Sequence, residues 1–153
     1  MADLGFEPAK KEARVDFELA ALDGTPRTLD DYAGSYVLLN FWATWCAPCR
    51  IEMPALERLH LELADHGLRV VGVDVGEETA DVERFVKETG ITFEIVIDAD
   101  LSTGRVYAAR SLPMTYILDP EGTIVARAIG AREWDSEPMR NMFAALVEEG
   151  TAG

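Results

Sequence analysis

The sequence lacks any apolar run close to the roughly 18 residues that a membrane-spanning helix requires. Its first residues, MADLGFEPAKKEARVDF, also lack the apolar core of a signal peptide. These absences predict a soluble chain without direct membrane insertion. The polar stretch EPAKKEAR equally fits the soluble part of an exported protein whose leader or anchor lies outside this sequence.

Basic residues are scarce. Lys and Arg number 14 against 28 Asp and Glu, so the formal net charge is -14 and the pI is near 4.4. This charge makes nucleic acid and anionic membranes poor partners, and it favours solubility, with steering toward a basic partner as the alternative. Hydrophobic residues at 48% and charged residues at 27% indicate one folded domain with an apolar core.

No internal repeat or second domain is apparent, and strand patterns alternate with helix patterns. Alternation of Val15, Phe17 and Leu19 before the turn at Asp23 and Gly24 predicts a leading strand or hairpin. We therefore expect an α/β domain over residues 15–150, preceded by a flexible N-terminal arm over residues 1–14. The predicted strands are 36–42, 68–75, 93–97, 114–118 and 123–129, and the predicted helices run from Cys49 to near Gly67, through 82–86 to Gly90, over 101–109, and over 139–147 with Ser136 or Asp135 as N-cap.

Only two cysteines are present, in the sequence Cys46-Ala-Pro-Cys49. Zinc binding with His60 and His66 is disfavoured, because a helix from residue 49 would separate Cys49 and His60 by roughly 16 Å along its axis. His60 is expected to pack on the inner face of that helix, and His66 to lie near its C-terminus. Haem attachment requires a histidine where Arg50 stands. A disulfide that closes four residues stabilises a fold little, so redox exchange remains, with no metal and no cofactor besides a redox-active Cys46–Cys49 disulfide.

The predicted order of strand, loop and helix places Cys46 at a helix N-terminus. Unpaired N–H groups and the helix dipole stabilise a thiolate there, so the pKa of Cys46 should fall from about 8.5 toward the roughly 3.5–7.5 range of Cys-x-x-Cys thiols. Cys46 is therefore the predicted nucleophile, and Cys49, one turn further on, is the predicted resolving thiol. Pro48 falls in the first helical turn, where a missing N–H is tolerated.

Three segments of the chain resemble the TlpA/ResA group of thiol-disulfide oxidoreductases in the thioredoxin superfamily. They are LLNFWATWCAPCRIEMPAL, VVGVDVGEETADVERFVKETGITFEIVID and SLPMTYILDPEGTIVARAIG, and the resemblance spans about Val15 to Val147. It implies a thioredoxin fold, with a central mixed β-sheet flanked by helices, an N-terminal hairpin, and an inserted helix and strand at about 79–97.

The resemblance also implies which residues contact a substrate. Pro113 matches the family's cis-proline, so the Leu112–Pro113 bond should be cis and the Leu112 main chain should pair with substrate. Trp45 should flank Cys46 as a contact surface, and Pro48 belongs to the same substrate-binding set.

A second group of implied roles concerns the protons. Glu52 matches an acidic residue that the group places beneath the cysteines, and we expect burial to raise its pKa so that it exchanges a proton with Cys49. The alternative is a surface glutamate that complements the helix dipole. Asn40 stands where plain thioredoxin has a buried aspartate, and it cannot carry a proton as a carboxylate does. Pro54 matches a helix-kinking proline.

The implied function is reduction of disulfides in exported client proteins, with cytochrome c maturation as one setting, after electrons arrive from an upstream membrane thiol-disulfide donor. The implied compartment is the periplasm or another extracytoplasmic space, with the cytoplasm as the alternative, and we expect a monomer. Other functions are a disulfide oxidase or isomerase, a thiol peroxidase, and a redox-inert binding module. The peroxidase motif Pro-x-x-x-Thr-x-x-Cys is not matched, because Leu39 and Ala43 stand at its Pro and Thr positions.

Overall fold

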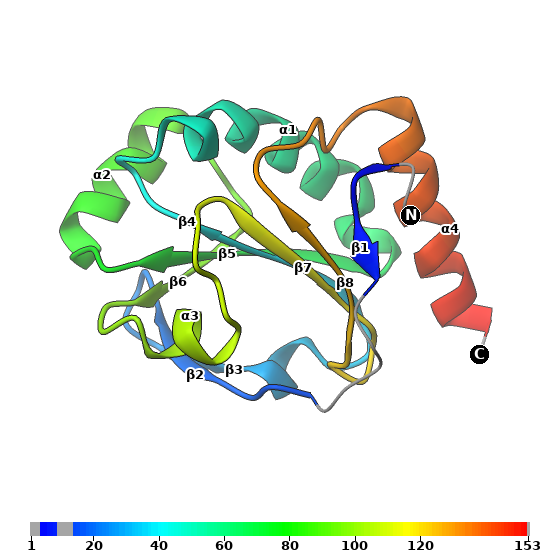
Figure 1. The fold of residues 1–153 in the computed structure, drawn as a ribbon, viewed down its shortest axis with the longest axis horizontal. Coiled ribbons are helices and arrows are strands. Elements are labelled where there is room, and N and C mark those ends of the chain that lie inside the picture. The colour runs from blue at the N-terminus through cyan, green and yellow to red at the C-terminus, as the bar shows by residue number, and fades with distance from the viewer. Residues whose placement is uncertain (1–3, 9–13, 153) are drawn as a thin grey trace.

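The fold is built on one eight-stranded mixed sheet in the order β1-β8-β7-β4-β5-β6-β2-β3 (Figure 1). The structure is a computed structural model, and it describes residues 4–8 and 14–152. The strands are β1 (Glu7–Pro8), β2 (Glu18–Ala21), β3 (Pro26–Thr28), β4 (Tyr36–Trp42), β5 (Leu68–Val75), β6 (Glu94–Asp98), β7 (Met114–Leu118) and β8 (Ile124–Ile129). The helices are α1 (Ala47–Leu63), α2 (Thr79–Thr89), α3 (Ser102–Val106) and α4 (Glu137–Ala152), with 3-10 turns η2 (Leu29–Tyr32) and η3 (Ala64–His66).

The centre of the sheet is parallel. Strands β4, β5 and β6 run in the same direction, whereas β7 pairs antiparallel with β4, and β8 antiparallel with β7. The carboxyl ends of the three parallel strands therefore share one edge of the sheet with the start of β7. The mixed sheet, the leading hairpin of β2 and β3, and the inserted α2 and β6 confirm the predicted thioredoxin-like fold.

Helices cover both faces of the sheet, which explains the nearly continuous apolar sequences of β4 and β5. Leu38 and Trp42 of β4 join the core cluster under α1, α2 and α4, while the alternate residues Leu39 and Phe41 join a second cluster with η2 and the segment after α3. Figure 1 shows α1 and α2 above the sheet and α3 below it. Residues Val37 to Trp42 of β4 are thus all buried on one face or the other.

The structure differs from the predicted N-terminal arm at residues 6–8. Glu7 and Pro8 pair with Arg127 and Ala126 of β8, and Phe6 is buried with its ring 5.8 Å from that of Trp134. A two-residue strand carries no periodic signal, and a lone phenylalanine among polar residues does not reveal its contact. The rest of the predicted arm includes residues 1–3 and 9–13, which lie outside the described residues.

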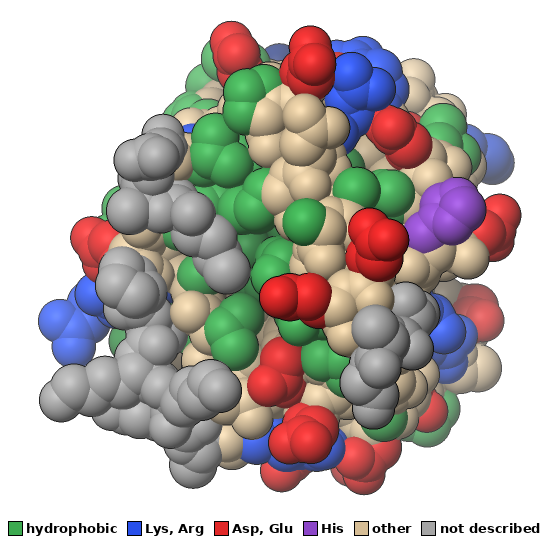
Figure 2. Space-filling view, turned by 90° about the vertical axis from the view of Figure 1, so that its right-hand side faces the viewer, with side chains coloured by type: hydrophobic (Ala, Val, Ile, Leu, Met, Phe, Trp, Pro, Cys, Tyr) green, Lys and Arg blue, Asp and Glu red, His purple; other side chains and the backbone are tan. Residues whose placement is uncertain are grey.

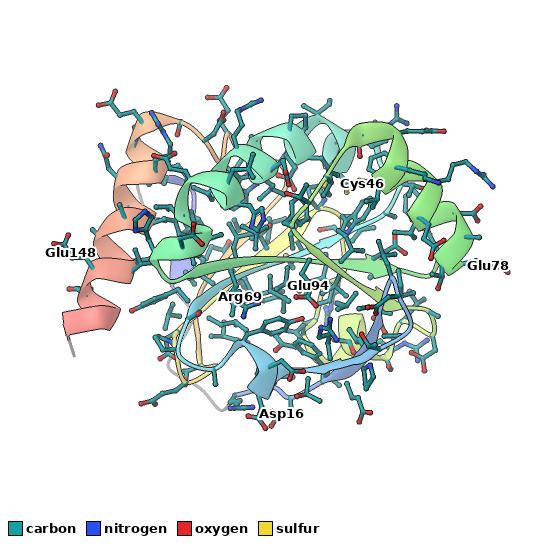
Figure 3. All side chains as sticks on the ribbon, turned by 180° about the vertical axis from the view of Figure 1, so that it is seen from behind. Asp16, Cys46, Arg69, Glu78, Glu94 and Glu148 are labelled. Atoms are coloured by element: carbon teal, nitrogen blue, oxygen red, sulfur yellow. A yellow bond between two sulfur atoms is a disulfide. The ribbon has the colours of Figure 1, made fainter. Side chains whose placement is uncertain are left out.

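One end of the molecule carries an exposed group of hydrophobic side chains (Figure 2). The end formed by α4 and the β1 edge presents hydrophobic side chains bordered by acidic ones (Figure 2). Cys46 and Glu78 lie toward the other end, away from Glu148 of α4 (Figure 3). Within the described residues, no helix combines the length and apolar character needed to cross a bilayer.

Candidate active site

The two cysteines lie where β4 passes through a short loop into α1. Cys46 is the N-cap of α1 in an extended conformation, and the Cys49 backbone N–H donates a hydrogen bond of 3.3 Å to Cys46 Sγ. The two sulfur atoms form a disulfide, with the Cα atoms 5.3 Å apart. Cys46 is 5% exposed and Cys49 fully buried, so the sulfur at the helix N-terminus is the more accessible one. The N–H groups and dipole of α1 favour negative charge on that sulfur.

The residues predicted to contact substrate either flank Cys46 in the chain or lie at the start of β7. Trp45 is 69% exposed, and Pro48 is exposed in the first turn of α1. The Leu112–Pro113 bond is cis, as the resemblance implies. Pro113 immediately precedes Met114, whose register partner is Phe41 near the end of β4. The start of β7 is thus next to the strand that leads into the Cys46 loop.

Glu52 lies inside the protein, and the alternative of a surface glutamate is wrong. The side chain is 2% exposed. Its Oε1 accepts a hydrogen bond of 2.8 Å from Asn40 Nδ2, and its Oε2 accepts one of 2.7 Å from Trp134 Nε1 and one of 3.1 Å from the Arg132 backbone N–H. Burial raises the pKa of the Glu52 carboxyl, and the three donors oppose that rise only in part.

Asn40 connects Glu52 to the sheet. It is fully buried in β4, and its Nδ2 also donates to Thr115 Oγ1 at 2.9 Å, across the β4–β7 pair. Sequence reasoning did not find Thr115, Arg132 or Trp134 as neighbours of Glu52. Arg132 and Trp134 follow Glu52 by 80 and 82 residues, and only the folded chain brings them together.

A second acidic group, also missed from the sequence, lies under the loop that carries Cys46. Asp74 is fully buried at the end of β5, and neither of its carboxyl oxygens accepts a hydrogen bond from the described residues. Glu77 accepts a hydrogen bond of 2.7 Å from the Thr44 backbone N–H and another from the Thr44 hydroxyl. Burial raises the pKa of Asp74 to about 9, and the proximity of Glu77 adds to the rise. A protonated Asp74 can therefore donate to Glu77, whose own pKa falls below its ordinary value despite partial burial. Asp74 lies within the apolar run of β5, so the strand pattern alone did not indicate a functional role for it.

The two histidines lie apart from the disulfide. His60 is half-buried in α1 with its ring 6.3 Å from Phe93, and His66 is exposed in η3. Within residues 4–8 and 14–152, no group of three or more His, Cys, Asp and Glu side chains is arranged to hold a metal ion.

Comparison with known proteins agrees with this geometry. The sequence profile of the AhpC/TSA family matches residues 11–127. The chain belongs to the AhpC/TSA family. It is 36% identical over 147 residues to the thiol-disulfide oxidoreductase ResA of Halalkalibacterium halodurans, a match that covers 96% of this chain and 81% of that protein. The similarity to the TlpA/ResA group is thereby confirmed.

Other relatives match over different lengths. The ResA protein of Geobacillus thermodenitrificans is 40% identical over 109 residues, which cover 71% of this chain and 63% of that relative. Among solved structures, a putative thiol:disulfide interchange protein DsbE from Chlorobium tepidum superposes with a TM-score of 0.83 at 28% identity, over 92% of this chain and 99% of that one. A secreted thiol-disulfide isomerase from Corynebacterium glutamicum superposes with a TM-score of 0.81 at 27% identity, over 94% and 92% of the two chains.

Proposed function

We propose that this protein is an enzyme, a thiol-disulfide oxidoreductase that reduces disulfide bonds in client proteins. The observation that carries the proposal is the Cys46–Cys49 disulfide at the N-terminus of α1, on a thioredoxin-like sheet. Family relatives that bear the name thiol-disulfide oxidoreductase support it.

The reaction begins from the reduced dithiol. The Cys46 thiolate attacks one sulfur of the client disulfide, which forms a mixed disulfide and releases the other client sulfur as a thiolate. The Cys49 thiolate then attacks the Cys46 sulfur, which releases the second client sulfur and forms the Cys46–Cys49 disulfide. Both electrons pass from the enzyme dithiol to the client, and the two client thiolates take up protons. Cys46 suits the first step because it is the more exposed sulfur and the N-cap of α1.

Glu52 supplies the base for the second step. Cys49 must lose its proton before it can attack, and Asn40 cannot accept it. Glu52 is three residues beyond Cys49 in α1, buried, and its carboxyl has a pKa above the ordinary value. A raised carboxyl pKa lies nearer to the pKa of a thiol, which makes proton exchange between the two groups easier.

The client contacts and the setting belong to the same proposal. Trp45, Pro48, Leu112 and Pro113 form the surface against which the client main chain lies. Clients are exported proteins with disulfides, apocytochrome c among them, and an upstream membrane thiol-disulfide protein returns the electrons. The description of the Corynebacterium glutamicum structure as secreted supports an extracytoplasmic site of action. The enzyme acts as a monomer and uses no cofactor besides its own cysteines.

Trapping of the mixed disulfide tests the proposal. Cys49→Ser should accumulate mixed disulfides through Cys46 with client proteins or a disulfide peptide, because the resolving thiol is gone. Cys46→Ser is the matched control, because it keeps one thiol but removes the attacking one, and it should trap little. Comparable trapping by both variants, or none by Cys49→Ser, contradicts the proposed division of roles.

Disulfide isomerase or oxidase activity is the second candidate, and the neighbour named secreted thiol-disulfide isomerase favours it. The reduction potential separates the two directions. A value near the −270 mV of thioredoxin supports a reductant, whereas about −180 to −120 mV supports an isomerase or oxidase. Equilibration with glutathione buffers of known ratio, followed by a count of free thiols, gives the potential.

A further inference from the structure

A cavity of about 520 Å³ lies beside Leu112, the residue that precedes the cis-proline. This volume falls within the range of roughly 300–1,000 Å³ that ligand sites occupy. Its apolar lining comes from Val75, Leu101, Ala108 and Leu112, and two arginines, Arg105 and Arg110, also line it. We call it the Arg105/Arg110 pocket.

The pocket shares an edge of the sheet with the disulfide. Val75 is the last residue of β5, and Leu101 follows the end of β6 by three residues. Cys46 follows the end of β4 by four residues, and β4, β5 and β6 are parallel neighbours. A client chain that runs past Leu112 therefore has this pocket within reach. The pocket extends the client-contact surface toward α3, which lies on the opposite face of the sheet from α1 (Figure 1).

The two arginines of the pocket lack acidic partners among the described residues. Both are exposed, and neither side chain makes a hydrogen bond or ion pair with the residues that the structure describes. The nearby carboxylates of Asp98 and Asp100 instead accept backbone N–H groups at the start of α3. Six of the other nine arginines pair with carboxylates, namely Arg14, Arg27, Arg58, Arg84, Arg127 and Arg140, whereas Arg50, Arg69 and Arg132 form no ion pair with a described carboxylate.

Arg105 and Arg110 differ from the other three arginines without a carboxylate partner because they line one apolar pocket together. The chain as a whole carries 28 acidic residues against 14 basic ones. Two unpaired guanidinium groups at one apolar pocket therefore leave local positive charge on a negative molecule. A planar guanidinium group can bind a carboxylate through two parallel hydrogen bonds. A carboxylate of another molecule is therefore a suitable partner for these two arginines.

The backbone around the pocket is strained. Leu101 and Ala108 have φ angles of 65° and 56°, in the left-handed region that residues other than glycine rarely adopt. This conformation is unfavourable for a residue with a Cβ atom, and residues of this kind cluster at binding sites. Leu101 is also 42% exposed despite its size. Both residues line the same cavity, so the rest of the fold maintains the shape of this cavity despite the unfavourable backbone conformation.

We propose that the Arg105/Arg110 pocket binds an acidic segment of the client protein. A client leucine or phenylalanine near the reacting cysteine enters between Leu101 and Leu112, and a neighbouring Asp or Glu carboxylate pairs with Arg105 and Arg110. This inference rests on the proposed function for its partner, but the binding itself does not require redox chemistry.

Peptide binding tests the inference independently of turnover. Two peptides are compared in 0.15 M salt, each with an apolar residue and a serine in place of the reacting cysteine, one with two glutamates and one with two glutamines. Fluorescence anisotropy should show the glutamate peptide binding about tenfold more tightly. Arg105→Glu/Arg110→Glu should abolish or reverse that preference, because the attracting charges are replaced by repelling ones.

The matched control is Arg84→Glu/Lys87→Glu on the exposed face of α2, which changes the net charge by the same amount and should keep the preference. Equal affinity for both peptides in the unaltered protein, or equal loss of the preference in both double variants, overturns the inference.

Reduction of a small neutral disulfide separates the two proposals. If the unaltered protein and both double variants reduce that disulfide at the same rate, the redox site is intact in all three. Any difference in peptide binding then comes from the pocket alone. If the unaltered protein reduces no disulfide but still prefers the glutamate peptide, the proposed function fails while the inference about the pocket stands.

Discussion

At the scale of single residues, the proposed role of the buried Glu52 carboxyl in resolving the mixed disulfide can be tested by its effect on rate and pH dependence. We expect Glu52→Gln to slow that step by at least about 100-fold, because positioned acid–base groups contribute roughly 10²–10⁴-fold. The wild-type rate should rise with pH through a pKa above that of an ordinary glutamate, since burial raises the pKa of Glu52, and the variant should lack that inflection. Stopped-flow release of a chromogenic thiol from the mixed disulfide measures both.

The control for this variant is Glu62→Gln, on the exposed part of the same helix, where the carboxylate pairs with Arg140. It should leave rate and pH profile unchanged. The Glu52 carboxylate accepts hydrogen bonds at both of its oxygens, whereas glutamine at position 52 has one acceptor oxygen. The stability of the variant to unfolding should therefore be measured in parallel. An unchanged resolution rate in a stably folded Glu52→Gln protein would falsify the role of Glu52.

Asp74 predicts a pH dependence of stability. Because its pKa in the folded state is about 9, the folded protein keeps this proton between about pH 4 and 9 while the unfolded chain loses it. The unfolded state then binds fewer protons, so the free energy of unfolding falls as pH rises through that window, by at most about 1.4 kcal/mol per pH unit. Asp74→Asn has no proton to lose. Urea midpoints at pH 5, 6 and 7 should therefore fall less in the variant.

Asp100→Asn serves as the control for this slope. Asp100 is exposed, and hydrogen bonds with Ser102 hold its pKa below the ordinary value, so it is ionised in both states above pH 5. Its replacement should leave the slope between pH 5 and 7 as in the wild type. A slope that Asp74→Asn does not reduce would show that Asp74 is already ionised in the folded protein.

At the scale of secondary-structure elements, Gly72 of β5 lies so close to the Trp42 side chain that no space remains for a side chain at position 72. A Cβ there would lie 2.9 Å from Trp42 Nε1 and 3.0 Å from Ile95 Cδ1. We expect Gly72→Ala to lower the free energy of unfolding by about 1–3 kcal/mol through overpacking. Phe93 Cε1 would lie 3.1 Å from the same Cβ, and Ile95→Val removes one of these three obstructing groups, so the double variant should recover part of the loss in urea denaturation. No recovery would argue against overpacking as the cause.

Sequence patterns predicted elements well where the signal was local. Strands β4, β5 and β7 occupy the residues predicted for them, because their apolar runs are long and end at polar or turn residues. The cysteine spacing identified the disulfide, and the resemblance supplied the buried Glu52. What sequence could not supply is long-range contact. Trp134 and Arg132 reach Glu52 only after the chain returns past β8, and β1 is too short to show a period.

At the scale of the whole molecule, the net charge of -14 should change the rate at which charged clients meet the protein. Long-range attraction should speed encounter with a basic client and slow encounter with an acidic one. The effect decays over a Debye length of about 30 Å at 0.01 M salt but only about 8 Å at 0.15 M. Added salt should therefore slow reduction of a lysine-rich disulfide peptide by several-fold and leave a neutral disulfide unaffected. Equal salt dependence for both substrates would contradict steering by net charge.

The acidic peptide separates long-range charge from local contact. Its reduction should become faster as salt rises from 0.01 to 0.15 M, because the repulsion from the whole molecule is screened first. The contribution of Arg105 and Arg110 acts at contact distance, so Arg105→Glu/Arg110→Glu should still slow this substrate at 0.15 M salt relative to Arg84→Glu/Lys87→Glu, which has the same net charge. The two effects thus oppose each other in low salt, and rate constants measured over a salt series for both variants resolve them. If the two double variants fall on one curve at every salt concentration, net charge alone governs the choice of client.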